Sequence, residues 1–231
     1  MHADRLILLF LKAPLPGNVK SRLAAGIGEE AALGLYRMLV LDAVEMLGET
    51  NYPAHYYYSP ADAGEAITSL LGAGRVLRPQ AGADLGSRME HAFHDAFAEG
   101  FSRVVLVGSD LPELDPLIIS EAFDALEQED AVLGPAADGG YYLIGFRKET
   151  MLSDVFHGIA WSTPTVFEET MKTMHANALR VHVLPQLHDL DTAVDLKAFW
   201  ERNRTGSRRS RFVQYIEKHR KTLFAFHRNL A

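Results

Sequence analysis

Hydrophobic positions follow two spacings that alternate along the chain. Continuous apolar runs at Leu6–Leu11 and Arg103–Val107 are typical of strands buried on both faces of a sheet. In Glu29–Leu47, apolar residues recur at helical spacing, namely Ala32, Leu35, Leu39, Ala43 and Met46. This alternation predicts βαβ units, which build a mostly parallel sheet with helices on both faces.

The remaining elements are predicted in the same way. Further strands are expected at Ala54–Tyr58, Arg75–Leu77, Ala131–Leu133, Tyr141–Phe146 and Arg180–Leu184. Further helices are expected at Pro60–Leu71, Gly86–Ala98, Pro116–Glu127, Pro164–His175 and about Ala193 to Glu201, with Ser162 or Thr163 capping the fourth of these. The predicted fold class is a Rossmann-like, three-layer α/β/α arrangement around a mostly parallel mixed sheet.

Length and composition favour one large domain over two small ones. The 231 residues are 48% hydrophobic, enough for a substantial core. The absence of cysteine excludes disulfides and thiolate metal sites, and it fits a reducing cytoplasm. No segment approaches the roughly 18 apolar residues of a membrane span. The first residues, MHADRLILLFLKAP, resemble a buried strand rather than a signal peptide.

Charge is distributed unevenly along the chain. The net charge of −7 argues against a general nucleic-acid binder. Residues 202–231 nevertheless carry nine Lys and Arg and one Glu, including Arg202, Arg204, Arg208, Arg209 and Arg211. We expect domain 1–201 to be followed by a flexible basic linker at 203–210 and an appended helix at Arg211–His227. This segment either holds a phosphate-bearing partner or is a solvated element against the acidic body.

The first loop that follows a strand is basic and rigid. KAPLPGNVKSR carries Lys12, Lys20 and Arg22, and its prolines, Pro16 among them, reduce the entropy lost on ordering. Gly17 lets the backbone turn sharply, and Lys and Arg suit phosphate oxygens. The loop matches neither the P-loop pattern nor the G-x-G-x-x-G fingerprint. An ordinary turn with solvated charges is the alternative.

Acidic residues follow two of the other predicted strands. Asp110 comes three residues after the predicted strand Arg103–Val107, where a carboxylate can bind Mg²⁺ or Mn²⁺, although it could equally satisfy loop amides. Asp189, Asp191 and Asp195 follow Arg180–Leu184 and repel one another unless a cation lies among them. Asp191 is therefore a candidate second metal ligand, or else Asp191 or Thr192 caps the next helix.

Two further loops are candidates for contact with a substrate. In LGPAADGGYY, Gly139 and Gly140 allow a ligand close to the backbone, beside Tyr141, and Asp138 could accept sugar hydroxyls or act as a base. An Asp-Gly hairpin turn explains the same residues without function. In RPQAGADLGSRM, Gly82, Gly86 and Arg88 suggest a loop that lines a substrate. No histidine pair has metal-ligand spacing, and no G-x-S-x-G elbow is present.

The order of these loops resembles the GT-A type nucleotide-diphospho-sugar transferase superfamily. More narrowly, KAPLPGNVKSRL is similar to the KAPxPGxVKTRL start of a bacterial family of candidate glycosyltransferases, with Ser21 in place of Thr. The resemblance covers roughly Leu6–Leu196. It implies that Lys12–Arg22 holds nucleotide phosphates and that Asp110 binds a metal. Asp191 matches a DTPEDL-like stretch that supplies a second metal ligand in related nucleotidyltransferases, although Pro and Glu are replaced here.

The resemblance implies a metal-dependent transferase but leaves the reaction open. A glycosyltransferase would move sugar from a nucleotide-sugar to a small acceptor, with Asp138 as the acceptor-activating base. A guanylyl- or cytidylyltransferase would instead take a nucleoside triphosphate and release pyrophosphate, which the DLDT-x-x-DL stretch favours. The superfamily's LAxGxGxR nucleotide loop is absent from this sequence, which disfavours the nucleotidyltransferase alternative. A nucleotide-sugar-binding regulator is the non-enzymatic alternative.

Overall fold

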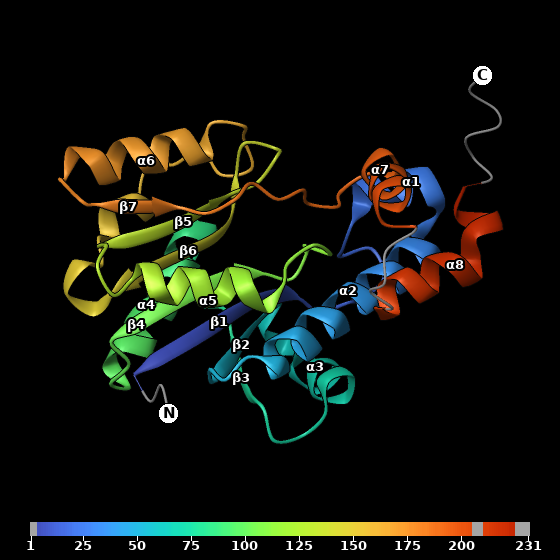
Figure 1. The fold of residues 1–231 in the computed structure, drawn as a ribbon. Coiled ribbons are helices and arrows are strands. Elements are labelled where there is room, and N and C mark those ends of the chain that lie inside the picture. Colours follow the sequence, from blue (N-terminus) through green and yellow to red (C-terminus); the bar gives the residue numbers. More distant parts are fainter. Residues whose placement is uncertain (1–3, 205–209, 225–231) are drawn as a thin grey trace.

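The protein is built around one seven-stranded mixed sheet (Figure 1). A computed structural model describes residues 4–204 and 210–224. The strands have the order β3-β2-β1-β4-β6-β5-β7. Only β6 runs antiparallel to its neighbours among these strands. Their bounds are β1 Arg5–Lys12, β2 Ala54–Ser59, β3 Val76–Pro79, β4 Arg103–Gly108, β5 Ala131–Pro135, β6 Tyr141–Arg147 and β7 Val181–Val183.

Helices alternate with these strands, as the spacing of apolar residues predicted. Their bounds are α1 Ser21–Ile27, α2 Glu29–Glu49, α3 Gly64–Leu71, α4 Leu85–Ala98, α5 Pro116–Ala125, α6 Val166–Ala176, α7 Ala193–Asn203 and α8 Arg211–Leu223. Short 3₁₀ turns lie at Ala61–Ala63, Lys148–Thr150 and Ser153–Phe156.

The sheet lies between two layers of helices, which confirms the predicted three-layer α/β/α class. Alternate residues of β1 point to opposite faces, as strand geometry requires. Ile7 and Leu9 belong to a buried cluster with α2, α3 and α5. Leu6 and Leu8 belong to a second cluster with α4 and α6. All four side chains are completely buried, so β1 forms the centre of the core.

A third hydrophobic cluster lies beside the sheet (Figure 1). Here α1, α7 and α8 pack with the first half of α2, through buried residues such as Leu35, Phe199 and Phe212. The N-terminus of α8 is fixed to α2, because Asp42 accepts hydrogen bonds from the backbone N–H groups of Arg211 and Phe212 at 2.9 Å. The described part of the basic C-terminal segment therefore packs against the acidic body.

Two sequence predictions differ from the structure in detail, and part of a third lies outside the described residues. A helix not predicted from the sequence, α1, begins at Ser21, so Arg22 lies in its first turn and not in the loop. The residue before α6 is Thr165, and its side chain makes no capping hydrogen bond, so the predicted cap at Ser162 or Thr163 is wrong. Residues 205–209 of the predicted linker, which include Arg208 and Arg209, and the predicted helix end at His227 lie outside the described residues.

No helix in residues 4–204 or 210–224 is both long enough and apolar enough to cross a membrane.

Candidate functional site

The carboxyl ends of the parallel strands open into one large cavity, the main cavity. It has a volume of about 470 Å³. Its walls come from four strand ends and the loops that follow them, at Lys12, Ser59, Gln80 and Asp110, and from Tyr141 at the start of β6. Ligands of open α/β sheets bind at this edge. The topology therefore brings the predicted loops to one place.

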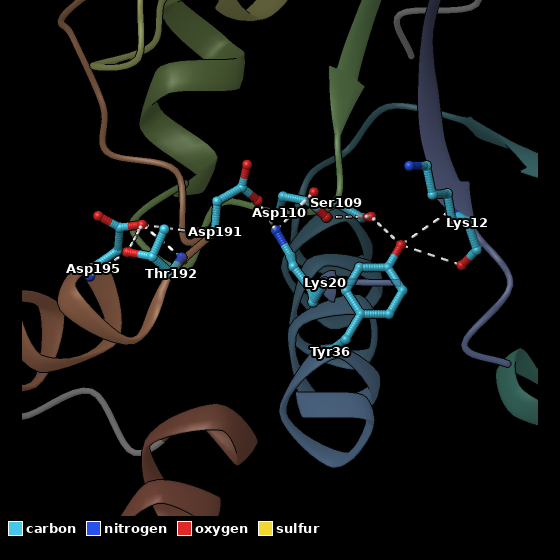
Figure 2. A network of polar contacts seen from close by, with 8 residues as sticks. All are labelled: Lys12, Lys20, Tyr36, Ser109, Asp110, Asp191, Thr192 and Asp195. Atoms are coloured by element: carbon cyan, nitrogen blue, oxygen red, sulfur yellow. Dashed lines mark hydrogen bonds and ion pairs between the residues drawn. The ribbon is translucent and has the colours of Figure 1, made fainter. Parts of the chain in front are cut away.

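The first loop is anchored to α2 by a buried tyrosine hydroxyl. Tyr36 Oη accepts a hydrogen bond from the backbone N–H of Lys12 at 3.0 Å and lies 3.2 Å from Lys12 O. It also lies 3.2 Å from the Oγ of Ser109, which precedes Asp110. Burial raises the pKa of Tyr36 far above its usual value, so the hydroxyl stays neutral. This contact fixes the end of β1 against the end of β4 (Figure 2).

Lys20 lies between the two predicted metal ligands (Figure 2). Its Nζ is 2.9 Å from Asp110 Oδ2 and 2.7 Å from Asp191 Oδ1. Only 3% of the Lys20 side chain is exposed, whereas the side chains of Asp110 and Asp191 are 44% and 39% exposed. We call Asp110 and Asp191 the carboxylate pair. The predicted phosphate-binding lysine is thus engaged with the carboxylate pair.

The charges around the carboxylate pair stabilise its ionised form. Burial alone would lower the pKa of Lys20, but Asp110 and then Asp191 outweigh burial and raise this pKa. Burial alone would raise the pKa of Asp191, but Lys20, with smaller contributions from Arg22 and Lys12, lowers it. An opposite charge within a few ångströms has this effect on a titrating group.

Lys12 and Arg22 remain available for a ligand. Within the described residues both side chains are exposed, and neither forms a hydrogen bond or ion pair. Together with Lys20 and the carboxylate pair they line a small cavity of about 200 Å³, the basic cavity. The Lys12 ammonium points away from Tyr36 (Figure 2). The basic cavity lies beside the main cavity, since Lys12 and the carboxylate pair border both.

The loop after β5 forms a hairpin turn and also lines the main cavity. β5 and β6 are antiparallel, and Asp138 Oδ1 accepts a hydrogen bond from the Gly140 N–H at 2.9 Å. Asp138, Gly140 and Tyr141 all border the cavity. Gly139 has another role: its φ is +91°, and a Cβ there would lie 2.1 Å from the carbonyl oxygen of Pro164. The segment therefore forms the predicted hairpin turn, and the same turn also faces the main cavity.

The structure brings most, but not all, of the predicted site residues to the cavities. Arg88 lines the main cavity, and its Nε donates to the Gly82 carbonyl at 3.1 Å. Pro16 and Gly17 lie in an exposed turn and line neither the main nor the basic cavity. Asp195 is used locally, because it forms a capping box with Thr192 at the start of α7. Helix capping thus accounts for Asp195, whereas Asp191 forms an ion pair with Lys20.

Asp189 is a site residue that sequence reasoning did not single out. It borders the main cavity and also a second cavity of about 340 Å³. Asp138 and Asp191 border both cavities as well. Burial, and after it the charge of Asp138, raises the pKa of Asp189 to about 6. The sequence shows the Asp189-Leu190-Asp191 run, but not which of these carboxylates faces Asp138.

The carboxylate pair has the donor chemistry of a substrate-shared divalent site. Carboxylates from the end of β4 and the start of α7 converge on one cation, the Lys20 ammonium, which shows that this point accepts positive charge. The described residues contain no group of three or more acidic or histidine side chains that could enclose a metal. Mg²⁺ is commonly held by one or two carboxylates together with substrate phosphates. Asp110 and Asp191 fit an ion of that kind.

Comparison with a family model places the chain among known proteins. Residues 42–163 match the model of uncharacterized proteins conserved in bacteria, DUF2064. The chain belongs to the DUF2064 family. The matched residues include Asp110 and Asp138 but exclude the first loop and Asp191. No curated protein matches the sequence.

Solved structures extend the likeness beyond these residues. A candidate nucleotide-diphospho-sugar transferase from Desulfovibrio desulfuricans G20 is 39% identical, with a TM-score of 0.93, over 96% of this chain and 98% of that one. This DUF2064 protein thus shares its fold, and over a third of its residues, with that relative from end to end.

More distant structures share the fold alone. CMP:2-keto-3-deoxy-manno-octonic acid synthetase in complex with CTP has a TM-score of 0.54 at 9% identity, over 85% of this chain and 97% of that one. Rv0371c from Mycobacterium tuberculosis H37Rv in complex with manganese has a TM-score of 0.50 at 15% identity, over 86% and 98%. The predicted nucleotide-diphospho-sugar transferase type of fold is confirmed.

Proposed function

We propose that this DUF2064 protein is a divalent-metal-dependent glycosyltransferase that moves a sugar from a nucleotide-sugar to a small hydroxylated acceptor. One observation carries the proposal. The main cavity of about 470 Å³ adjoins the basic cavity, in which Lys12 and Arg22 have no ion pair and two carboxylates converge on one point. The 39% identical relative, a candidate nucleotide-diphospho-sugar transferase, supports the same class of donor.

In this proposal the donor lies along the main cavity with its diphosphate in the basic cavity. Lys12 and Arg22 bind phosphate oxygens, because they are the exposed, unpaired cations of that cavity. The sugar then lies toward Gly140, Tyr141 and Arg88 in the main cavity. Fixed cations near the leaving diphosphate stabilise the charge that develops when the bond to the sugar breaks.

Asp110 and Asp191 are proposed to hold Mg²⁺ or Mn²⁺ together with the donor phosphates. The ion would neutralise charge on the leaving diphosphate. Rv0371c, a protein of the same fold at 15% identity, was solved in complex with manganese. Tyr36 positions this end of the site, since its hydroxyl joins the strand that carries Lys12 to the residue before Asp110.

The acceptor is proposed to enter from the second cavity. Asp138 and Asp189 form part of the wall between the two cavities, so a hydroxyl bound there can approach the sugar of the donor. Asp138 is our proposed base. It takes the proton of the acceptor hydroxyl while the oxygen forms a bond to the sugar's anomeric carbon and the nucleoside diphosphate leaves. His188 and Arg202 also border the second cavity, and both contact Glu113.

Nucleotidyl transfer is the second candidate. The fold is shared with a synthetase that was solved with CTP, and the same cations and carboxylates would serve a triphosphate. In that reaction a substrate oxygen attacks the α-phosphate and pyrophosphate leaves. Fold likeness does not choose between the two reactions.

Product analysis separates these functions. The protein is incubated with Mg²⁺ or Mn²⁺, a panel of nucleotide-sugars and nucleoside triphosphates, and hydroxylated acceptors with and without phosphate or carboxylate groups. We expect nucleoside diphosphate from a nucleotide-sugar, dependent on an acceptor. Pyrophosphate from a triphosphate alone would replace this proposal with nucleotidyl transfer. Tight binding without turnover across the panel would indicate a nucleotide-sugar-binding regulator.

A further inference from the structure

Lys20 occupies the place that a metal would take between the carboxylate pair. Its Nζ is 2.9 Å and 2.7 Å from oxygens of Asp110 and Asp191. A divalent ion bound to the same two oxygens would lie between them at about 2.0–2.6 Å from each. The ammonium group and the ion therefore cannot both occupy this point.

The backbone of Lys20 indicates that the position of its side chain is specified. Lys20 has φ 51° and ψ 43°, the left-handed region that favours glycine, and it precedes the first turn of α1. A residue with a β-carbon is strained there. The structure nevertheless directs this side chain inward, where 3% of it is exposed, while its neighbours Ser21 and Arg22 stay exposed.

The carboxylate pair would be unstable without a counter-ion. Asp110 lies after β4 and Asp191 lies before α7, and both contact the same ammonium group (Figure 2). Two carboxylates that share a site repel each other unless a cation lies between them. Lys20 supplies that cation, and so joins the loop after β4 to the segment before α7.

Other cations are free to receive the diphosphate first. Lys12 and Arg22 border the basic cavity with Lys20, and neither side chain makes a hydrogen bond or ion pair within the described residues. Phosphate oxygens held by these two side chains would lie beside the Lys20 ammonium. They would offer it an alternative to the carboxylates.

We propose that Lys20 is an exchangeable counter-ion that excludes the divalent ion from Asp110 and Asp191 until a diphosphate draws its ammonium group away. Metal alone therefore binds weakly, and donor and metal bind cooperatively. Because binding free energies are linked, the metal strengthens diphosphate binding by the same factor as the diphosphate strengthens metal binding. This inference rests on the proposed metal site, and it adds an order of binding to that proposal.

Metal titration of the full chain tests the exclusion directly. Free Mn²⁺ is measured by electron paramagnetic resonance, without nucleotide, for wild type, Lys20→Met and Lys20→Arg. We expect Lys20→Met to bind Mn²⁺ at least about tenfold more tightly than wild type, within the usual range of coupling between two ligands. Lys20→Arg retains the positive charge and should bind as weakly as wild type. Equal or weaker binding by Lys20→Met would mean that Lys20 supports the metal site and does not compete with it.

A double variant separates failure of this inference from failure of the metal site. Lys20→Met with Asp110→Asn should lose the Mn²⁺ binding that Lys20→Met gains. If binding to Lys20→Met is unaffected by Asp110→Asn, or if neither wild type nor Lys20→Met binds Mn²⁺, the metal site itself is wrong and the inference fails with it.

A measurement on wild type does not depend on the folding of any variant. The ¹⁵N signal of the Lys20 ammonium group, assigned by comparison with Lys20→Arg, is followed by NMR. We expect little change on adding Mg²⁺ alone and a large shift on adding Mg²⁺ with pyrophosphate. An equally large shift with Mg²⁺ alone would overturn the proposed order.

Discussion

Ion pairs lie at both ends of the parallel strands, at the amino ends (the amino edge) and at the carboxyl ends (the carboxyl edge), but their charges are balanced differently. At the amino edge, Asp4 contacts Arg103, while Asp130 accepts hydrogen bonds from Arg147 and from the backbone N–H and Nε of Arg180. The pKa values of both carboxyl groups are lowered, mainly by hydrogen bonds from Ser102 to Asp4 and from the Arg180 backbone to Asp130.

At the carboxyl edge, acidic groups outnumber the cations that they contact. Asp110 and Asp191 share one ammonium group, and Asp189 has a pKa of about 6 because of burial and the nearby Asp138. At the amino ends of the strands each of these carboxylates has its own cations and hydrogen-bond donors, whereas at the carboxyl ends Asp110 and Asp191 share a single cation. Perturbed groups of this kind gather at functional sites.

The largest effect is expected from Asp110→Asn. Loss of one carboxylate from the pair removes half of the proposed ion site, so turnover should fall by at least about 100-fold, as removal of a strong electrostatic contribution to catalysis does. The protein should stay folded, because the Lys20 ammonium keeps its ion pair with Asp191 in this variant. Steady-state assays with Mg²⁺ and the thermal midpoint provide the measurements.

Asp62→Asn is the matched control for Asp110→Asn. Asp62 is an exposed residue of the 3₁₀ turn Ala61–Ala63 and lines none of the three cavities. If Asp110→Asn turned over as fast as Asp62→Asn, Asp110 would have no role in the reaction.

The fold and the place of the site followed from local patterns in the sequence. A strand such as Arg103–Gly108 is buried on both faces, so its apolar run is continuous, and the first polar residues after it, Ser109 and Asp110, lie at the edge where it ends. Parallel pairing then brings the ends of β1 and β4 together, with Phe10 opposite Gly108. Lys12 and Asp110 could therefore be assigned to one site without coordinates.

The roles within the site depend on geometry that the sequence does not carry. Lys20 was expected to face a phosphate, but a left-handed backbone just before α1 turns its side chain toward Asp110 and Asp191. Tyr36 belongs to the apolar face of α2, and only the tertiary fold shows that its hydroxyl reaches Lys12 and Ser109. Such contacts join residues that are far apart in the chain.

Asp130→Asn should have the opposite profile to Asp110→Asn. The variant weakens charge-assisted hydrogen bonds from Arg147 and Arg180, so the free energy of unfolding at pH 7 should fall by about 1–2 kcal/mol, while turnover is retained. Because the folded-state pKa of Asp130 is lowered, its stabilisation is present above its unfolded pKa of about 3.9 and is lost as the pH falls further. Denaturant unfolding at pH 7 and pH 3 measures both differences.

A stability loss for Asp130→Asn that was as large at pH 3 as at pH 7 would contradict the role of its charge. Reduced turnover in a stably folded Asp130→Asn protein would contradict the separation of the two edges.

Lys12→Met should weaken donor binding without affecting the fold. Lys12 is exposed and its ammonium group makes no hydrogen bond or ion pair within the described residues. The expected change is a KM for the donor about tenfold higher, together with a lower kcat, because the same cation stabilises charge on the leaving diphosphate. Lys172→Met, which removes an exposed lysine of α6, is the matched control and should leave KM unchanged. Equal KM values for the two variants would show that Lys12 does not contact the donor.

The smallest expected effect has the opposite pH dependence to that of Asp130. Because the folded-state pKa of Asp189 is raised to about 6, the folded protein binds this proton more tightly than the unfolded chain does. The free energy of unfolding therefore falls as the pH rises from about 4 to about 6. In EDTA, Asp189→Asn should match wild type at pH 4 and exceed it by about 1 kcal/mol at pH 8, a value reduced for solvent screening of a half-buried group. The curves of Asp62→Asn and wild type should stay parallel from pH 4 to 8. If those of Asp189→Asn and wild type did so as well, burial and Asp138 would not raise the pKa of Asp189.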